Sequence, residues 1–385
     1  MNKNMNSKKL LKQLSFIDKI YCKNNTLPIL DCVLFSNRTI TYITLDNEIK
    51  VLCDYNGPDV LVPYLSLKEF IKNSKDCNIE IIYDKALASV TIKNPISFIK
   101  LNSPSIDEFP RYAESKYKQI DTLIKEDIEN LVHTSLYSSK ENYKPILQCV
   151  FLSDNAIVGT DSIKLFFVKR KYPNKLNINY LIKTNIIKLF KGLDVIKVLR
   201  DNSGEYSILQ FVNENFHLYH RMQEGNFPDY ISVIPTEKNY KKLAKITYNT
   251  KLMCDIAKSL KNINKGLHQG RFVFSLETKI CKVYSCDMDL NKEQVATIPF
   301  ECEMLEGYLE NLGRNELEIA FDLRNIELYL SGCKQLTSEH IFFIPFDTIS
   351  LKDDTIKEEI EWNYVNKASL INGEYLIMPQ KIYNT

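Results

Sequence analysis

An amphipathic helix pattern occurs three times in this sequence, at intervals of little more than a hundred residues. Apolar side chains at helical spacing occur in residues 7–20, 125–139 and 249–263, which aligns Leu14, Leu131 and Ile256 at intervals of 117 and 125. A second pattern of strand, short turn and helix recurs in residues 60–73, 178–192 and 317–332. A repeat of this kind predicts three similar domains in one chain.

Alternating and β-branched runs lie between these helices, for example "RTITYITL", "SFIKLN", "IKLFFVKR" and "YSILQFV". Turn residues bound each run, which is typical of antiparallel strands. We therefore predict an α+β fold of three repeated domains, each with two helices packed on antiparallel sheets, at residues 1–117, 118–240 and 241–385. Pro110, Pro228 and Pro379 each follow a strand near the end of a repeat, where a residue without an N–H group stops strand pairing.

Composition indicates a soluble globular protein, with 44% hydrophobic and 25% charged residues among 385. The N-terminal stretch lacks the apolar core of a secretory signal, and no apolar run is long enough to span a membrane. We therefore expect a cytoplasmic, nucleoid-associated protein.

Metal, redox and catalytic sites are not expected. The ten cysteines are scattered without a Cys-x-x-Cys pair, and His217 and His220 would point to opposite faces of a strand. The sequence contains no Gly-rich phosphate loop and no Gly-x-Ser-x-Gly or His-Glu-x-x-His motif. Asp46 and Glu48 alternate along a predicted strand, which favours a solvated face over a catalytic pair. We predict no cofactor, no metal and no enzymatic activity.

Positive charge is concentrated in three helical windows, although the whole chain carries only +2. Residues 1–24, 183–200 and 241–265 carry +5, +4 and +6, so the remaining residues carry −13. Such segregation suits a surface that follows DNA phosphates without reading bases. Lysines that simply decorate exposed helices would give the same pattern, so charge alone leaves both interpretations open.

Five separated motifs resemble the bacterial sliding clamps, the beta subunits of DNA polymerase III. These are "NTLPILDCVLF", "VPYLSLKEFI", "VGTDSIKL", "EGNFPDYISVIP" and "YLIMPQKI", in the family's order and close to its spacing. The resemblance implies a head-to-tail homodimeric ring of six similar domains that encircles duplex DNA. It also implies that the ring tethers the polymerase, the clamp loader and repair factors through short linear peptides.

The resemblance places a hydrophobic peptide pocket between the second and third domains. Its walls map to Ile146, Thr160, Asp161, Leu165, Pro228, Val233, Leu376, Ile377, Met378 and Pro379. Without the family pattern, "IMP" would be interpreted as an ordinary closing strand. The chain departs from the pattern at Ser162, Ile163 and Lys164, where the family has Gly and two often polar residues, and this change puts partner preference in doubt.

Position within the basic windows makes Lys8, Lys12, Lys183, Lys191, Lys258 and Lys265 candidates for the DNA-facing surface. Lys140 and Lys144 fall where family members place a DNA-contacting loop. Ring closure is expected to join the edge strand of Ile99 and Leu101 to the helix near Leu260 of a second copy.

Two alternatives stay open. The first is a clamp paralogue of a phage or mobile element with altered partner choice, motivated by "TDSIKL" and by an insertion at residues 347–367. The second, more remote, is a multidomain binding protein or enzyme that is not a clamp. Solution mass would separate a dimeric ring from a monomeric binding module.

Overall fold

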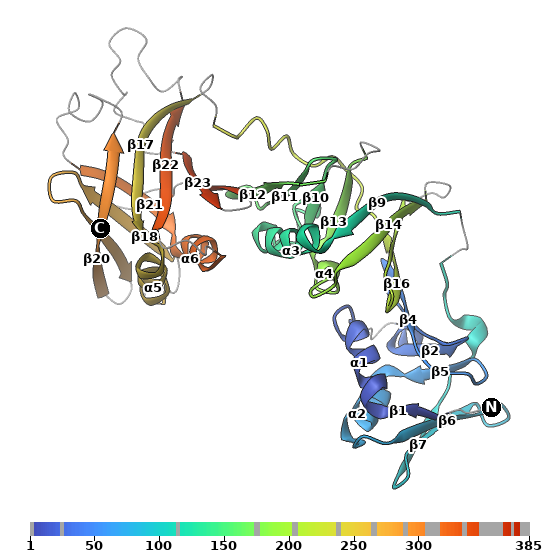
Figure 1. The fold of residues 1–385 in the computed structure, drawn as a ribbon. Helices are drawn as coiled ribbons and strands as arrows, with labels where there is room; N and C mark the ends of the chain where they lie inside the picture. The colour runs from blue at the N-terminus through green and yellow to red at the C-terminus, as the bar shows by residue number, and fades with distance from the viewer. Residues whose placement is uncertain are drawn as a thin grey trace. The chain divides into compact units, whose positions relative to one another are not determined.

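The computed structural model describes residues 4–23, 27–112, 116–172, 178–201, 207–235, 240–262, 268–287, 292–304, 316–332, 337–345, 365–370 and 373–377. Across these residues one order of elements recurs three times, namely strand, helix, four strands, helix and three strands (Figure 1). All described strand pairs with an assigned register are antiparallel. The α+β class and the two helices in each third of the chain are therefore confirmed.

The chain forms two compact units. Unit 1 comprises residues 1–132, 152–155 and 172–224, and unit 2 comprises residues 133–151, 156–171 and 225–385. This division passes through the middle repeat, so the domain boundaries proposed from the sequence remain predictions.

Two helices of unit 1, α1 (Ser7–Asp18) and α2 (Tyr64–Asn73), pack against each other. Asn6 caps α1, because its side chain accepts the N–H of Lys9 at 3.0 Å. Leu10, Leu14 and Ile17 then lie on one helical face and are fully buried. Each such side chain contributes about 1.5–3 kcal/mol when it leaves water.

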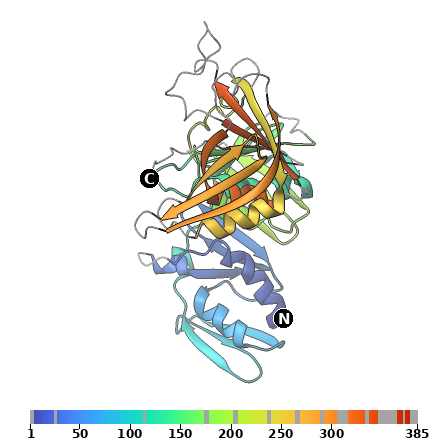
Figure 2. The ribbon, with the colours of Figure 1, turned by 90° about the vertical axis from the view of Figure 1, so that its left-hand side faces the viewer.

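A four-stranded sheet in unit 1 ends in a free edge. Its order is β1 (Asn4–Asn6), β6 (Asn78–Asp84), β7 (Ser89–Lys93) and β8 (Phe98–Asn102). Figure 2 shows the cyan hairpin of β7 and β8 as the outermost strands of this sheet. Among the described strands β8 pairs only with β7, which leaves its other edge open.

Unit 1 also contains an eight-stranded sheet. Its order is β5 (Val60–Pro63), β2 (Cys32–Ser36), β3 (Thr39–Ile43), β4 (Asn47–Leu52), β16 (Phe216–Arg221), β15 (Ile208–Val212), β14 (Val195–Asp201) and β9 (Lys118–Ile124). The pairing of β4 with β16, which we call the first junction, joins strands of the first and second repeats. Short 3-10 turns at Pro28–Asp31 and Ile106–Glu108 precede β2 and β9 respectively.

The second helix of the middle repeat is shorter than predicted. Strand β13 (Tyr180–Lys183) leads directly into α4, which spans only Thr184–Ile187, whereas the pattern predicted a longer helix within residues 178–192. The chain then continues through successive turns, with Leu189 and Phe190 buried. The apolar spacing therefore identified buried positions correctly and overestimated the length of the regular helix.

Helix α3 (Lys125–Thr134) and the 3-10 turn Ser135–Tyr137 lead into the strands of unit 2. Their order is β10 (Cys149–Leu152), β11 (Ala156–Thr160), β12 (Lys164–Lys169), β24 (Gly373–Ile377), β23 (Val365–Leu370), β22 (Thr337–Pro345), β17 (Tyr240–Asn249), β20 (Lys292–Met304), β19 (Ile280–Asp287), β18 (Gln269–Ser275) and β21 (Glu316–Asp322). The pairing of β12 with β24, which we call the second junction, joins strands of the second and third repeats.

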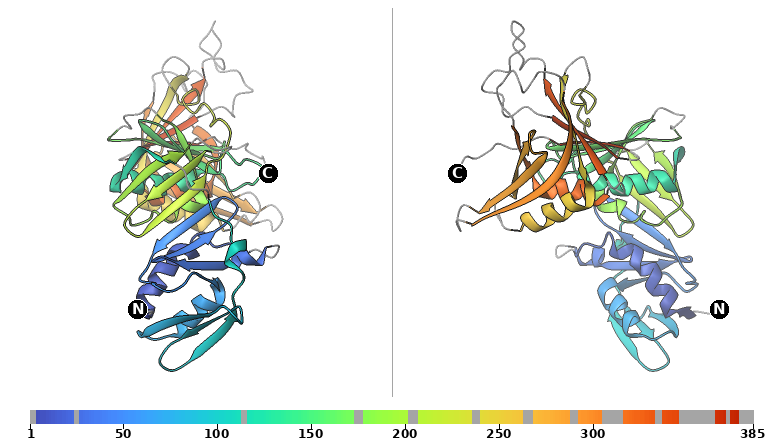
Figure 3. Two further views of the ribbon diagram at one scale, coloured as in Figure 1. Left: turned by 90° about the vertical axis from the view of Figure 1, so that its right-hand side faces the viewer. Right: turned by 60° about the vertical axis from the view of Figure 1, so that its left-hand side comes forward.

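Helices α5 (Thr250–Leu260) and α6 (Leu323–Gly332) pack together in unit 2, and the right-hand view of Figure 3 shows them beside its long strands. Asn249 caps α5 as Asn6 caps α1, accepting the N–H of Leu252 at 2.9 Å. The first helices of the first and third repeats therefore share both capping chemistry and a buried apolar face.

Candidate functional site

The sequence Phe-Pro-x-Tyr occurs twice, at residues 109–112 and 227–230. Two side chains of the second copy, Phe227 and Tyr230, pack on an apolar cluster in unit 2. Residues 225–235, here called the second strap, lay Phe227, Tyr230 and Ile234 against the sheet of β10, β11 and β12. Phe227 stacks on Phe151 with ring centroids 5.0 Å apart, and Tyr230 lies 6.3 Å from Phe167. The sequence analysis did not predict the packing of Phe227 and Tyr230 on Phe151 and Phe167. The Phe and Tyr close to Pro228 could have indicated that this segment packs on the sheet.

The second junction brings two predicted pocket residues together. Leu165 of β12 lies directly opposite Leu376 of β24, and both belong to the same apolar cluster. Each is about 5% exposed or less, so the pair forms a floor rather than a rim. These residues are 211 positions apart in the sequence, and only the pairing of β12 with β24 makes them neighbours.

The departure from the family pattern lies in the turn before β12. Asp161 holds this turn, because its Oδ1 accepts the N–H groups of Ile163 at 2.9 Å and Lys164 at 2.8 Å. Thr160 Oγ1 donates to the carbonyl of Lys164 at 2.7 Å. Ser162 has a φ of +79°, the left-handed region that favours glycine. Asp161 and Thr160 therefore maintain a glycine-type turn around a serine.

We expect Ser162→Gly to stabilise unit 2 by about 1 kcal/mol, because glycine adopts this φ without a Cβ penalty. Urea unfolding of the variant would measure the gain. Ser162→Ala is the control, since it removes the hydroxyl but keeps the Cβ, and it should give no gain. Equal stabilisation by both variants would show that the hydroxyl, rather than the backbone, carries the strain.

Exposed apolar side chains lie close in sequence to the residues of this floor. Ile163 and Val233 are 52% and 51% exposed, and Pro228 is also exposed. Ile146 is half-buried and packs on the start of the strap, because a Cβ added at Gly225 would lie 2.7 Å from Ile146 Cδ1. Lys144 Nζ donates to Ser162 Oγ at 3.0 Å, which adds a cation to the rim.

Three predicted wall residues are described partly or not at all. The backbone of Ile377 pairs with Lys164, and its side chain lies outside the described residues. Met378 and Pro379 also lie outside them, as do residues 347–364 of the predicted insertion. The pocket therefore stays a prediction, supported by its described floor and rim.

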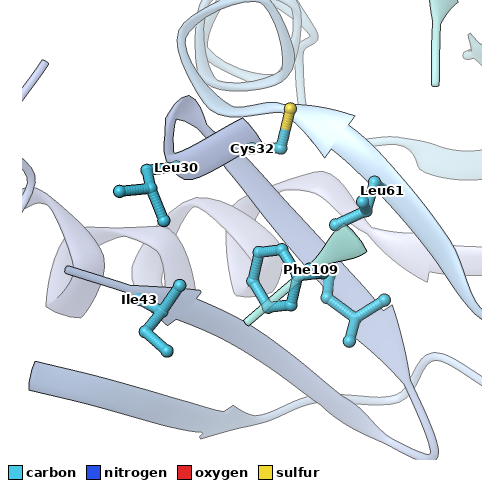
Figure 4. Close-up of a cluster of buried hydrophobic side chains, with 6 residues drawn as sticks. Leu30, Cys32, Ile43, Leu61 and Phe109 are labelled. Atoms are coloured by element: carbon cyan, nitrogen blue, oxygen red, sulfur yellow. The ribbon is translucent and has the colours of Figure 1, made fainter. Parts of the chain in front are cut away.

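Unit 1 contains an equivalent segment, residues 109–112, here called the first strap. Phe109 lies in an apolar cluster with Leu30, Cys32, Ile43 and Leu61 (Figure 4), to which Leu34 also belongs. Tyr112 packs against the same cluster. Where the second junction has Leu165 opposite Leu376, the first junction has Glu48 opposite Tyr219.

The carboxylate of Glu48 contacts two donor groups, which makes the first junction polar at this pair of strands. This carboxylate is 2.9 Å from Lys50 Nζ and accepts the N–H of Tyr112 at 2.8 Å. The side chain of Glu48 is nearly fully buried, so the solvated face predicted for it was wrong. Burial, with smaller contributions from Asp46 and Glu48, raises the pKa of Tyr112 to about 12. The two straps therefore pack alike on apolar clusters, whereas the two junctions differ in chemistry.

The predicted DNA-facing lysines have different environments. Lys8, Lys12, Lys140, Lys191 and Lys258 are exposed, and Lys265 lies outside the described residues. Burial and the charge of Lys191 lower the pKa of Lys19, so cations of α1 and of the segment after α4 lie near one another. Lys183 instead forms an ion pair with Asp46 at 2.8 Å, which makes it a less available phosphate ligand.

The residues expected at a dimer contact are also in different environments. Ile99 and Leu101 are half-buried in the edge strand β8, whereas Leu260 is fully buried in its own domain. The Leu260 side chain is therefore not available on the surface of this domain.

Within the described ranges, no three His, Cys, Asp or Glu side chains are grouped so that they could hold a metal ion. No helix in this part of the chain is long and apolar enough to cross a bilayer. His217 is half-buried while His220 is fully buried, in agreement with opposite faces of β16.

Structural comparison finds similar folds over nearly the full length of the chain. A DNA polymerase III beta subunit from Thermotoga maritima is 17% identical, with 99% of both chains covered and a TM-score of 0.78. The beta chain from Streptococcus pneumoniae is 14% identical, with 98% and 99% covered and a TM-score of 0.80. A sliding clamp from Pseudomonas aeruginosa, solved with griselimycin bound, is 16% identical, with 98% and 99% covered and a TM-score of 0.78.

No protein-family model matches the sequence, and no curated protein matches it either. At the identities of the solved structures, the likeness establishes the fold alone. The chain has the fold of the bacterial sliding clamps, as the sequence motifs predicted.

Proposed function

We propose that this chain is a DNA sliding clamp, a processivity factor without catalytic activity. Two copies would join head to tail, encircle duplex DNA and tether the replicative polymerase and other factors by short peptides. The observation that carries the proposal is the second junction, where Leu165, Leu376 and the second strap form an apolar floor with an exposed apolar rim.

The composition of this floor suits linear peptides. Aromatic and aliphatic side chains offer a surface for apolar anchors, and the polar turn at Asp161 borders it. These features support DNA polymerase III alpha subunit, clamp loader and repair factors as classes of partner.

The exposed lysines of α1, α5 and the segment after α4 support sequence-independent DNA binding. Lysines without fixed base contacts hold DNA weakly, so binding to linear duplex should be lost at modest salt concentrations. Stable association would then require a closed ring around the DNA. A protein of this kind would work in the cytoplasm with the nucleoid.

Peptide binding tests the proposal directly. A fluorescent peptide from the C-terminal tail of a DNA polymerase III alpha subunit should bind with saturation, and Val233→Asp should weaken binding at least 10-fold, because a charge on the rim opposes apolar anchors. Val195→Asp is the matched control, since Val195 is 50% exposed in β14, in unit 1. The double variant Met378→Ala, Pro379→Ala should also lose binding.

Two results would contradict parts of the proposal. Equal loss in the Val195→Asp control would mean that binding is not local to the second strap. A wild-type dimer that ignores the polymerase peptide would favour the paralogue with altered partners, which the Ser162, Ile163 and Lys164 departure already motivates.

A further inference from the structure

A polar cavity lies at one end of the first junction, within unit 1. Its volume is about 290 Å³, and it is lined by Asp46, Lys183, Arg221, Met222, Gln223 and Glu224. The N–H of Arg221 donates to the carbonyl of Asp46 at 2.9 Å, which fixes the end of β16 against the turn before β4. The N–H of Met222 donates to the carbonyl of Ser207, also at 2.9 Å. Backbone hydrogen bonds of the fold therefore hold two walls of the cavity in place.

Charged side chains of both signs line this cavity. Lys183 Nζ lies 2.8 Å from Asp46 Oδ2, and both side chains are partly exposed. Arg221 is half-buried, and Glu224 is exposed. The lining therefore combines two cations and two carboxylates, and Gln223 adds an amide that can donate and accept hydrogen bonds.

The pKa values of two neighbouring groups show that these charges are unevenly distributed. After burial, the larger effect on His220 comes from Lys183 and lowers its pKa, while Asp46 opposes this shift less strongly. After burial, Asp46 raises the pKa of Tyr112 more than Arg221 lowers it. The potential is therefore positive toward His220 and negative toward Tyr112.

A charge distribution of this kind disfavours simple ions. A phosphate would meet the carboxylates of Asp46 and Glu224, and a divalent metal ion would meet the cations of Lys183 and Arg221. A ligand that carries one charge of each sign would instead find a partner for both of them.

We propose that this cavity binds a small zwitterion of the size of an α-amino acid, its carboxylate held by Lys183 and Arg221 and its ammonium group by Asp46 and Glu224. A guanidinium binds a carboxylate through two parallel hydrogen bonds, which gives Arg221 the orienting role. The volume lies just below the range of about 300–1,000 Å³ that is usual for ligand pockets, so it suits one small molecule. This inference concerns unit 1 and goes beyond the proposed clamp.

Three matched small molecules test the charge pattern of the ligand. L-Alanine carries both charges, whereas propionate carries only the carboxylate and ethylammonium only the cation. In saturation-transfer NMR titrations of the full chain, alanine should saturate at millimolar concentrations. Its dissociation constant should be at least about 10-fold below that of either single-charge molecule, because each of these loses one set of charged hydrogen bonds. Equal binding of alanine and propionate, or an alanine signal that does not saturate, would overturn the proposal.

Substitutions test the location. Arg221→Gln should weaken alanine binding at least about 10-fold, because it removes the guanidinium. Glu224→Gln, at an exposed position where the fold tolerates change, should weaken it about threefold. Arg200→Gln is the matched control, since Arg200 is also half-buried in unit 1 and is not among the lining residues. Equal loss in this control, or no loss in either test variant, would overturn the location, and far-ultraviolet circular dichroism would show that each variant is folded.

Neighbouring side chains of a peptide are a second source of the two charges. A Glu-Lys dipeptide with blocked ends carries both charges on its side chains, and it should bind more weakly than alanine because it is larger than the cavity suits. Tighter binding of the dipeptide would overturn the amino-acid ligand and assign the cavity to a protein partner. Binding of the polymerase peptide is a separate measurement, so its failure would contradict the clamp and leave this cavity unaffected.

Discussion

Acidification from pH 6.5 to pH 3 is expected to lower the free energy of unfolding of unit 1 by about 4 kcal/mol through His220 alone. This side chain is fully buried in β16, and burial, followed by the charge of Lys183, lowers its pKa to about 3. Asp46, the partner of Lys183, opposes this shift only in part.

The sign follows from which state binds the proton. Below pH 6.5 the unfolded chain protonates His220 while the folded protein keeps it neutral, so protons favour unfolding until the pH reaches the folded pKa. The buried contacts explain the neutral form. Nδ1 lies 2.8 Å from Asn47 Oδ1, which accepts its proton, and Nε2 has no partner among the described residues. Above pH 6.5 the contribution is fully present.

Urea unfolding across this pH range would measure the effect, with His220→Leu as the test variant. The variant should lose stability at pH 7.5 because Asn47 loses its partner, and its dependence on pH between 3 and 6.5 should be flatter by about 4 kcal/mol. His217→Leu is the control from the other face of the same strand, and it should change the slope by under about 1 kcal/mol. An unchanged slope in His220→Leu would place the acid-sensitive group elsewhere.

Gly159→Ala is expected to destabilise unit 2 by about 2–3 kcal/mol, through overpacking rather than backbone strain. A Cβ at this position of β11 would lie 2.6 Å from the carbonyl oxygen of Thr134 and 2.9 Å from its Cγ2. Neither group moves freely, because Thr134 ends α3 and is fully buried. The end of this helix therefore requires a glycine on the strand beneath it.

Thermal or urea unfolding would measure the loss, and a second change would identify its source. Adding Thr134→Ser removes the methyl contact but leaves the carbonyl, so it should restore only part of the stability. Full restoration would assign the effect to the methyl group. Gly192→Ala provides a contrast, because a φ of +84° with no atom within 4 Å of the added Cβ should cost only about 1 kcal/mol.

The spacing of apolar residues predicted the threefold repeat well, because residues at that spacing lie on the buried face of a helix. Leu14, Leu131 and Ile256 are all buried positions of the first helix of their repeats, and Ile71, Phe190 and Leu330 are buried in the second set. The same spacing could not show that α4 ends at Ile187, since buried turns and a buried helix place apolar residues alike.

Long-range pairing was much less accessible from the sequence. Lys183 was assigned to the DNA-facing set from its window, but its partner Asp46 is 137 residues away and is reached only through the fold. Leu260 was expected near a dimer contact, and its full burial is determined by packing inside the third repeat. Leu165 and Leu376 were grouped by resemblance, and their direct pairing across β12 and β24 gives that grouping a physical cause.

The unequal chemistry of the two junctions has a consequence for the stoichiometry of the proposed clamp. Glu48, Lys50 and Tyr219 occupy the positions that Leu165, Phe167 and Leu376 occupy at the second junction, so of the two described junctions the second alone would offer apolar anchors an apolar floor. The proposed ring of two subunits would then offer two apolar floors, one in each subunit, to several kinds of partner. In the proposed clamp, partners would compete for these two surfaces, so local abundance and relative affinity, rather than separate docking places, would determine which partner is bound.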